Sequence, residues 1–117
     1  VKEAQIAAET VGAGATWDIA FSQDDQQEFI YVADGSNMKV HVVDRDSLEV
    51  LYVLGEGGRQ SGLFYGTHSI VTDSRGNFYT TETYEGKRIQ KFQYRGLRPL
   101  DQIQSGPAWP EGSLIGE

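Results

Sequence analysis

The stretch Thr16-Trp17-Asp18-Ile19-Ala20-Phe21-Ser22 has a counterpart in Thr67-His68-Ser69-Ile70-Val71-Thr72-Asp73, at an offset of 51 (67 minus 16). Both stretches begin with threonine and have isoleucine at the fourth position. Further along, Lys39-Val40-His41-Val42-Val43 matches Arg88-Ile89-Gln90-Lys91-Phe92 at an offset of 49 (88 minus 39). Repeats with a period of roughly 20–50 residues indicate solenoids, propellers or arrays.

Each repeat is divided into short runs that are typical of β-strands. In the first repeat these runs are residues 16–22, 29–34, 39–43 and 48–54, and Asp, Gly, Ser and Asn lie between them. Four short antiparallel strands per repeat are the plan of a propeller blade. The alternative is one eight-stranded sandwich or small barrel, which gives no reason for a strand pattern to recur in order. We therefore predict an all-β fold of two four-stranded antiparallel β-propeller blades.

Two segments carry a resemblance to a known family. Tyr31-Val32-Ala33-Asp34-Gly35-Ser36-Asn37-Met38-Lys39-Val40 and the stretch 68–79 resemble NHL repeats, and the resemblance spans residues 16–104. The second repeat departs from the family at Thr80-Thr81-Glu82, where Val-Ala-Asp is more usual. The resemblance implies a β-propeller. NHL propellers serve as enzymes, RNA-binding surfaces and protein-docking platforms, so the fold alone does not give the function.

The repeat divides the chain into four parts. We expect an N-terminal strand and hinge over residues 1–15, a first blade over 16–57, a second blade with a long entry connection over 58–106, and an irregular tail over 107–117. Residues 4–10 have strand character. They are expected either to latch onto the last blade of a neighbouring subunit or to form a loosely held terminal segment.

Two blades are too few for a closed propeller, which has roughly four to eight. An isolated pair exposes two apolar blade faces, and repeat arrays need several units before burial outweighs chain entropy. Because NHL propellers resemble six-bladed rings, three copies of this chain would complete one. We expect a homotrimer, or else a chain that is a piece of a longer propeller.

Composition excludes several classes of function. The formal net charge is −7, which disfavours nucleic acid as a partner because such binding needs clustered Lys and Arg. With no cysteine, the chain has no disulfide, thiolate nucleophile or Cys-based zinc site. It contains no apolar run long enough to span a membrane and no signal-peptide pattern, so we expect a soluble protein with no membrane partner.

Candidate binding residues gather where the first strand of each blade begins. In a propeller these strands line the central channel, which places Trp17, Asp18 and His68 near one mouth of it. Arg59 and Tyr65 lie on the connection that leads to His68 and are expected to overhang the same mouth. The expected ligand is a small molecule or a protein, and Arg59 is suited to an anionic group.

His68 is the candidate metal ligand. In the peptidylglycine amidating lyases, whose propeller resembles this one, histidines at the starts of alternate blades bind zinc. Three copies of His68 around a threefold axis would supply such a site for a divalent metal such as zinc. The alternative is a histidine that only hydrogen-bonds neighbouring backbone. Asp18 is expected to be a channel ligand or a hydrogen-bonding carboxylate, and His41 a surface or inter-blade side chain.

Three functions follow from these patterns. The first is a binding scaffold without catalysis. The second is a metal-dependent lyase or hydrolase at the channel mouth, with Asp18, Arg59 and Tyr65 assisting His68. The third is a blade fragment of a larger propeller with no separate activity.

Overall fold

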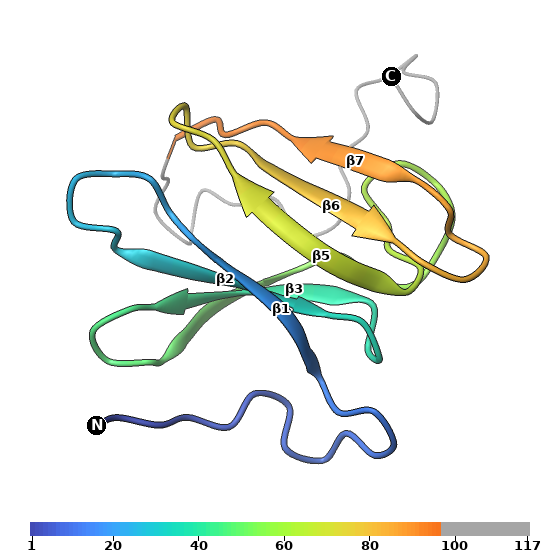
Figure 1. Cartoon of the computed structure of the whole chain (residues 1–117), viewed down its shortest axis with the longest axis horizontal. Helices are drawn as coiled ribbons and strands as arrows, with labels where there is room; N and C mark the ends of the chain where they lie inside the picture. Colours follow the sequence, from blue (N-terminus) through green and yellow to red (C-terminus); the bar gives the residue numbers. More distant parts are fainter. Residues whose placement is uncertain (97–117) are drawn as a thin grey trace.

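The computed structural model describes residues 1–96, which form an all-β structure. Seven strands make two antiparallel sheets, one in the order β1-β2-β3-β4 and one in the order β5-β6-β7 (Figure 1). The strands are β1 (Thr16–Phe21), β2 (Phe29–Asp34), β3 (Lys39–Asp44), β4 (Val50–Leu54), β5 (Thr67–Thr72), β6 (Phe78–Glu82) and β7 (Ile89–Phe92). The predicted fourth strand of the second repeat and the tail over 107–117 lie outside the described residues.

The repeat in sequence is also a repeat in structure. β1 pairs with β2 through a register irregularity between Thr16 and Asp18, and β5 pairs with β6 through the same irregularity between Thr67 and Ser69. Thr67 and Ser69 are the repeat equivalents of Thr16 and Asp18. Matching strands therefore change register at matching residues. Such irregularities are specific features of a strand and not random defects.

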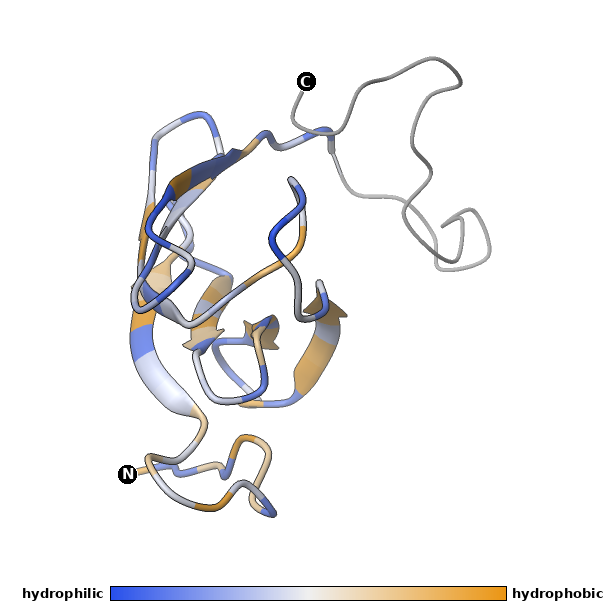
Figure 2. Cartoon of the chain, turned by 90° about the vertical axis from the view of Figure 1, so that its right-hand side faces the viewer, coloured by the Kyte–Doolittle hydropathy of each residue, from blue (hydrophilic) through white to orange (hydrophobic). Residues whose placement is uncertain are grey.

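The core lies between the two stacked sheets. Ala33 and Val40 from the first sheet pack with Ile70 and Phe78 from the second, and all four side chains are buried. The ring of Phe78 stacks on Phe92 with 4.6 Å between the ring centroids. Apolar colours accordingly gather on the strands, whereas many turns are blue (Figure 2).

The connection between the sheets, residues 55–66, is part of this core. Phe64 is completely buried and stacks on Phe92 at 5.2 Å. Gly55 has φ +81°, and a Cβ built on it would lie 2.2 Å from the Phe64 ring. Glycine is therefore required there both by the backbone conformation and by the aromatic ring.

Residues 1–15 contain no strand, so the strand predicted over 4–10 is wrong for the single chain. Ala7 has φ +47° and its carbonyl accepts a hydrogen bond from the Thr10 amide at 2.9 Å, which makes a turn. The segment runs along the side of the first sheet that faces away from the second (Figure 1). Pairing of this segment with a neighbouring subunit stays a prediction.

The part of the chain that the structure describes has no helix long and apolar enough to cross a membrane.

Candidate ligand site at the start of the first strands

The structure brings three aromatic side chains together where β1 and β5 begin. Trp17 and His68 meet edge to face with ring centroids 5.7 Å apart. Tyr84, in the turn between β6 and β7, lies 6.5 Å from Trp17 in a similar orientation. We call these three residues the aromatic cluster. Tyr84 is 73% exposed and His68 is also exposed, so the cluster presents ring surface to solvent.

Trp17 is held firmly within the cluster. Its indole N–H donates to the carbonyl of Gly14 at 3.0 Å. Its six-membered ring lies against Gly35, where a Cβ would come within 2.2 Å of the ring carbons. The absence of a side chain at Gly35 therefore lets the indole lie flat on the backbone of the β2–β3 turn.

Asp18 has a structural role. One carboxylate oxygen accepts a hydrogen bond from the Ile19 amide at 2.9 Å, and the other accepts from the Ile70 amide on β5, also at 2.9 Å. Asp18 thereby connects the two sheets. Of the two expectations for this residue, the structure supports the hydrogen-bonding carboxylate.

Arg59 and Tyr65 meet each other beside the aromatic cluster. The guanidinium carbon of Arg59 lies 5.0 Å from the centre of the Tyr65 ring, and its Nη2 donates to Glu85 Oε2 at 3.0 Å. Arg59 is therefore already paired with a carboxylate, which weakens the expectation that it holds an anion. Because Glu85 follows Tyr84 directly, this pair borders the cluster.

The Nδ1 atom of His68 makes a long contact, 3.3 Å, with the hydroxyl of Ser69. Among residues 1–96, no group of three or more His, Cys, Asp or Glu side chains is arranged to hold a metal ion. The metal site expected at His68 draws one histidine from each of three chains, so a single chain does not test it.

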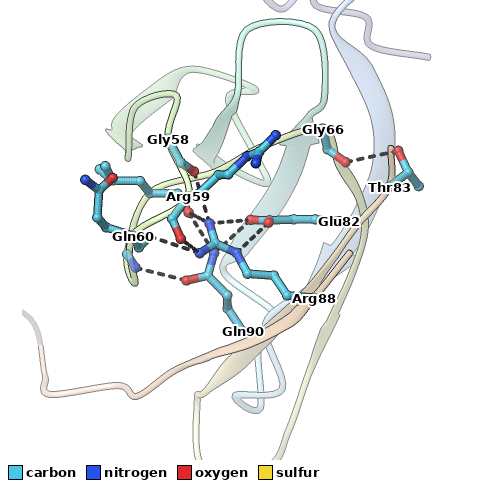
Figure 3. A network of polar contacts seen from close by, with 10 residues as sticks. Gly58, Arg59, Gln60, Gly66, Glu82, Thr83, Arg88 and Gln90 are labelled. Atoms are coloured by element: carbon cyan, nitrogen blue, oxygen red, sulfur yellow. Dashed lines mark hydrogen bonds and ion pairs between the residues drawn. The ribbon is translucent and has the colours of Figure 1, made fainter. Parts of the chain in front are cut away.

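A second polar network, centred on Arg88, was not predicted from the sequence (Figure 3). The Arg88 guanidinium donates to Glu82 Oε2 at 2.5 Å and to the carbonyls of Leu63 at 2.6 Å and Gly58 at 3.1 Å. Gln90 donates to Glu82 Oε1 at 2.8 Å. The Glu82 side chain has no exposed surface, and a buried charge needs compensating partners. The donors of Arg88 and Gln90 provide them.

The first sheet has a related network at the equivalent positions. Asp34 aligns with Glu82 at an offset of 48 (82 minus 34), and His41 aligns with Gln90 at an offset of 49 (90 minus 41). His41 Nε2 lies 2.8 Å from Asp34 Oδ2, and both residues are buried. The expectation of a surface position for His41 is therefore wrong, and an inter-blade position stays a prediction. The alignment of two acids at the ends of β2 and β6 was the sequence signal for both networks.

A small cavity of about 270 Å³ adjoins the Asp34–His41 pair. Asn37 donates to the Asp34 carboxylate from its backbone amide at 2.9 Å and from its side-chain amide at 2.8 Å. Because Asn37 and His41 already supply donors to both carboxylate oxygens of Asp34, the cavity offers little further capacity for a ligand at that carboxylate.

A larger groove of about 850 Å³ lies between the sheets on their open side. Its lining is rich in aromatic side chains: Phe29, Tyr31, Tyr52, Phe78, Phe92 and Tyr94. Tyr31 and Phe78 also contact each other across the sheets, with ring centroids 5.4 Å apart. The groove therefore continues the core outward.

Asp73 caps the turn between β5 and β6. It accepts hydrogen bonds from the side-chain amide of Asn77 at 2.9 Å, the hydroxyl of Tyr79 at 3.0 Å and the backbone amide of Arg75 at 2.9 Å. The hydrogen bond from Asn77 is the largest of the causes that lower the pKa of Asp73 to about 2. Because each donor stabilises the carboxylate, the perturbation reflects turn capping and not acid–base chemistry.

No family model and no curated protein gives a significant match to this chain. Functional conclusions therefore depend on the residues of the chain itself.

Proposed function

We propose that the two sheets are neighbouring blades of an NHL-like propeller and that the chain serves as a ligand- or protein-binding scaffold. Three chains would complete a ring of six blades. The proposal is supported by the matching register irregularities of β1 and β5 and by the contact between these strands, which would line the channel of a propeller.

The observation that carries the binding role is the exposed aromatic cluster at the start of these strands. Trp17 is half-buried and fixed in place by Gly14 and Gly35, and with the exposed rings of His68 and Tyr84 it offers a preformed surface for a ligand. The net charge of −7 favours a positively charged ligand group. A cation over aromatic rings gains about 0.5–2 kcal/mol per contact. The ligand class is therefore an ammonium or guanidinium group, either on a small molecule or on a basic segment of a protein.

Trp17 provides the test, because only one other tryptophan, Trp109, is present in the chain. In a Trp109→Phe variant, Trp17 fluorescence should change on titration with tetramethylammonium and saturate in the millimolar range. Acetate, an anion of comparable size added as its sodium salt, should give no saturable change. Tyr84→Ala should weaken the tetramethylammonium response, and Thr81→Ala, at an exposed strand position, should not. If tetramethylammonium leaves the fluorescence unchanged, the cationic-ligand proposal is wrong.

Oligomeric mass tests the ring separately. A ring of three chains has three times the mass of one chain, which is 13.0 kDa. Light scattering that gives 13.0 kDa at micromolar concentration would rule out the homotrimer. Ligand binding by such a monomer would still support the scaffold, since the aromatic cluster belongs to one chain.

A further inference from the structure

Each sheet has two faces, and the repeat relates the packed face of one sheet to the outward face of the other. The row that crosses the second sheet on the side toward the first consists of Ile70, Thr80 and Gln90. Its repeat-equivalent row in the first sheet consists of Ile19, Val32 and His41. The strand pairings connect both rows in the same order. The equivalent row, however, lies on the side of the first sheet that faces away from the second, because the alternate residues Ala20, Tyr31 and Ala33 pack on the core.

The same relation holds for the other face. Val40 of the first sheet is buried against the second sheet. Its equivalent, at an offset of 49 (89 minus 40), is Ile89, which is 74% exposed. Val71, on the same outward face as Ile89, is 54% exposed. The outward face of the second sheet is thus the counterpart of a face that is packed within the chain.

We infer that these two outward faces bind each other between copies of this chain, head to tail. The outward face of the second sheet in one chain, with Val71 and Ile89, would pack on the outward face of the first sheet in the next chain, with Ile19 and Val53. This inference rests on the proposed ring and names its interface. The contact is heterologous, so it either closes into a ring or continues as a filament.

The N-terminal segment of each chain lies over part of this face, and Lys2 Nζ donates to the Asp46 carbonyl at 2.5 Å at its far end, so the segment either becomes part of the contact or moves aside. Asn37 Nδ2 donates to the Thr10 hydroxyl at 2.8 Å, and the Ser36 hydroxyl donates to the Gly14 carbonyl at 2.6 Å, which holds the segment at the β2–β3 turn. In the second sheet, residues 55–66 approach the end of β6 in a similar way, and Ile70 and Phe78 still pack on the first sheet. Ile19 remains 46% exposed beside the segment.

The contact between chains is expected to be weaker than the contact within the chain. Within the chain, Asp18 accepts from the Ile70 amide and the Thr72 hydroxyl donates to the Phe21 carbonyl at 2.6 Å. In the contact between chains, Ser69 takes the place of Asp18 and has a shorter side chain. Phe21 takes the place of Thr72 and has no hydroxyl. The Ile19 amide already donates to its own Asp18, so a separated chain leaves that amide satisfied. The chains should therefore separate on dilution while the contact within each chain persists.

Complementary variants test the interface. Ile19→Glu removes one half of it and Ile89→Glu removes the other, and both positions are exposed. Each chain should therefore still fold, as judged by a cooperative melting transition whose midpoint falls only by the stabilisation that assembly contributes. Each variant alone should be a monomer of 13.0 kDa, and an equimolar mixture should give a dimer of twice that mass, because one intact interface remains between unlike chains. Gln26→Glu, at an exposed position in the β1–β2 turn and on neither face, should assemble as the wild type does.

The outcomes separate the interface from the ring. A mixture that stays monomeric would overturn the inference. A single variant that still assembles would also overturn it, because a symmetric contact through one face is lost only in the variant that changes that face. A mixed dimer together with a wild-type mass other than that of a trimer would support the interface and remove the six-bladed ring.

Discussion

The carboxylate of Asp18 accepts the backbone amide of Ile70 at 2.9 Å and so joins the first strands of the two sheets. Replacing Asp18 with alanine leaves this amide and that of Ile19 without their acceptor. We expect a loss of about 1–3 kcal/mol in the free energy of unfolding, the cost of an unsatisfied buried donor. Urea unfolding followed by circular dichroism measures it. Asp25→Ala, at an exposed aspartate, is the control, and an equal loss in both variants would contradict the role of Asp18.

The two arginine–carboxylate pairs should differ sharply in their contribution to stability. Arg88→Met leaves the buried Glu82 carboxylate uncompensated, and we expect a loss of about 3–5 kcal/mol. Arg59→Met breaks the pair with Glu85, in which both side chains are at least 60% exposed, and should cost about 0–1 kcal/mol. The same unfolding measurement compares them. Similar losses in the two variants would show that the Arg88 network is not buried as described.

Asp73 should contribute to the pH dependence of stability. Its pKa is lowered from 3.8 to about 2 in the folded chain, chiefly by the hydrogen bond from Asn77. The carboxylate therefore stabilises the fold above about pH 4, and this contribution is lost as the pH falls from about 4 to about 2. Carbon-detected NMR titration of the Asp73 carboxyl measures the pKa directly. Asn77→Ala should raise it toward its ordinary value, and an unchanged pKa in that variant would assign the shift to another donor.

Gly35 should control the aromatic cluster without contacting solvent, since it is buried. A methyl group at this position would lie 2.2 Å from the Trp17 ring, so Gly35→Ala should displace the indole. We expect a shifted Trp17 emission maximum in the Trp109→Phe background and a weaker response to tetramethylammonium. Gly12→Ala, at a glycine with no neighbouring atom within 4 Å, is the comparison that leaves the ring in place. An unchanged emission in Gly35→Ala would refute this account.

Metal content distinguishes the scaffold from the lyase-like alternative. For protein purified without a His-tag or added metal, the scaffold predicts fewer than one zinc ion per three chains by plasma mass spectrometry. The alternative predicts one zinc ion per three chains, lost in His68→Ala. A stoichiometric, His68-dependent zinc ion would therefore move the proposal to an enzyme.

The strands were predictable because the repeat marks them twice. The blocks that begin at Thr16 and Thr67 form β1 and β5. Tyr31 in β2 pairs with a residue of β1, and Tyr79 in β6 pairs with the equivalent residue of β5. The strand predicted over residues 4–10 fails because apolar composition there is not matched by a partner strand. Residues 1–96 offer none, and a turn at Ala7 takes its place.

The candidate site was predictable only in part. The repeat predicts that Trp17 and His68 lie near each other, and their rings are 5.7 Å apart. The pairing of Arg59 with Glu85 and the contacts of Arg88 depend on how residues 55–66 fold back on the second sheet. No periodicity encodes such a loop conformation. Tyr84 was not selected for the same reason, because it lies in a turn.

The contacts of Arg88 with the carbonyls of Gly58 and Leu63 have a kinetic consequence. They attach the connection between the sheets to the second sheet, although it follows the first in the chain. In amide hydrogen exchange, the amides of Gly58 and Phe64 should open together with β6 and β7 and not with β4. The unit that opens cooperatively would then begin in residues 55–66, before β5, and the first sheet would be able to fluctuate separately.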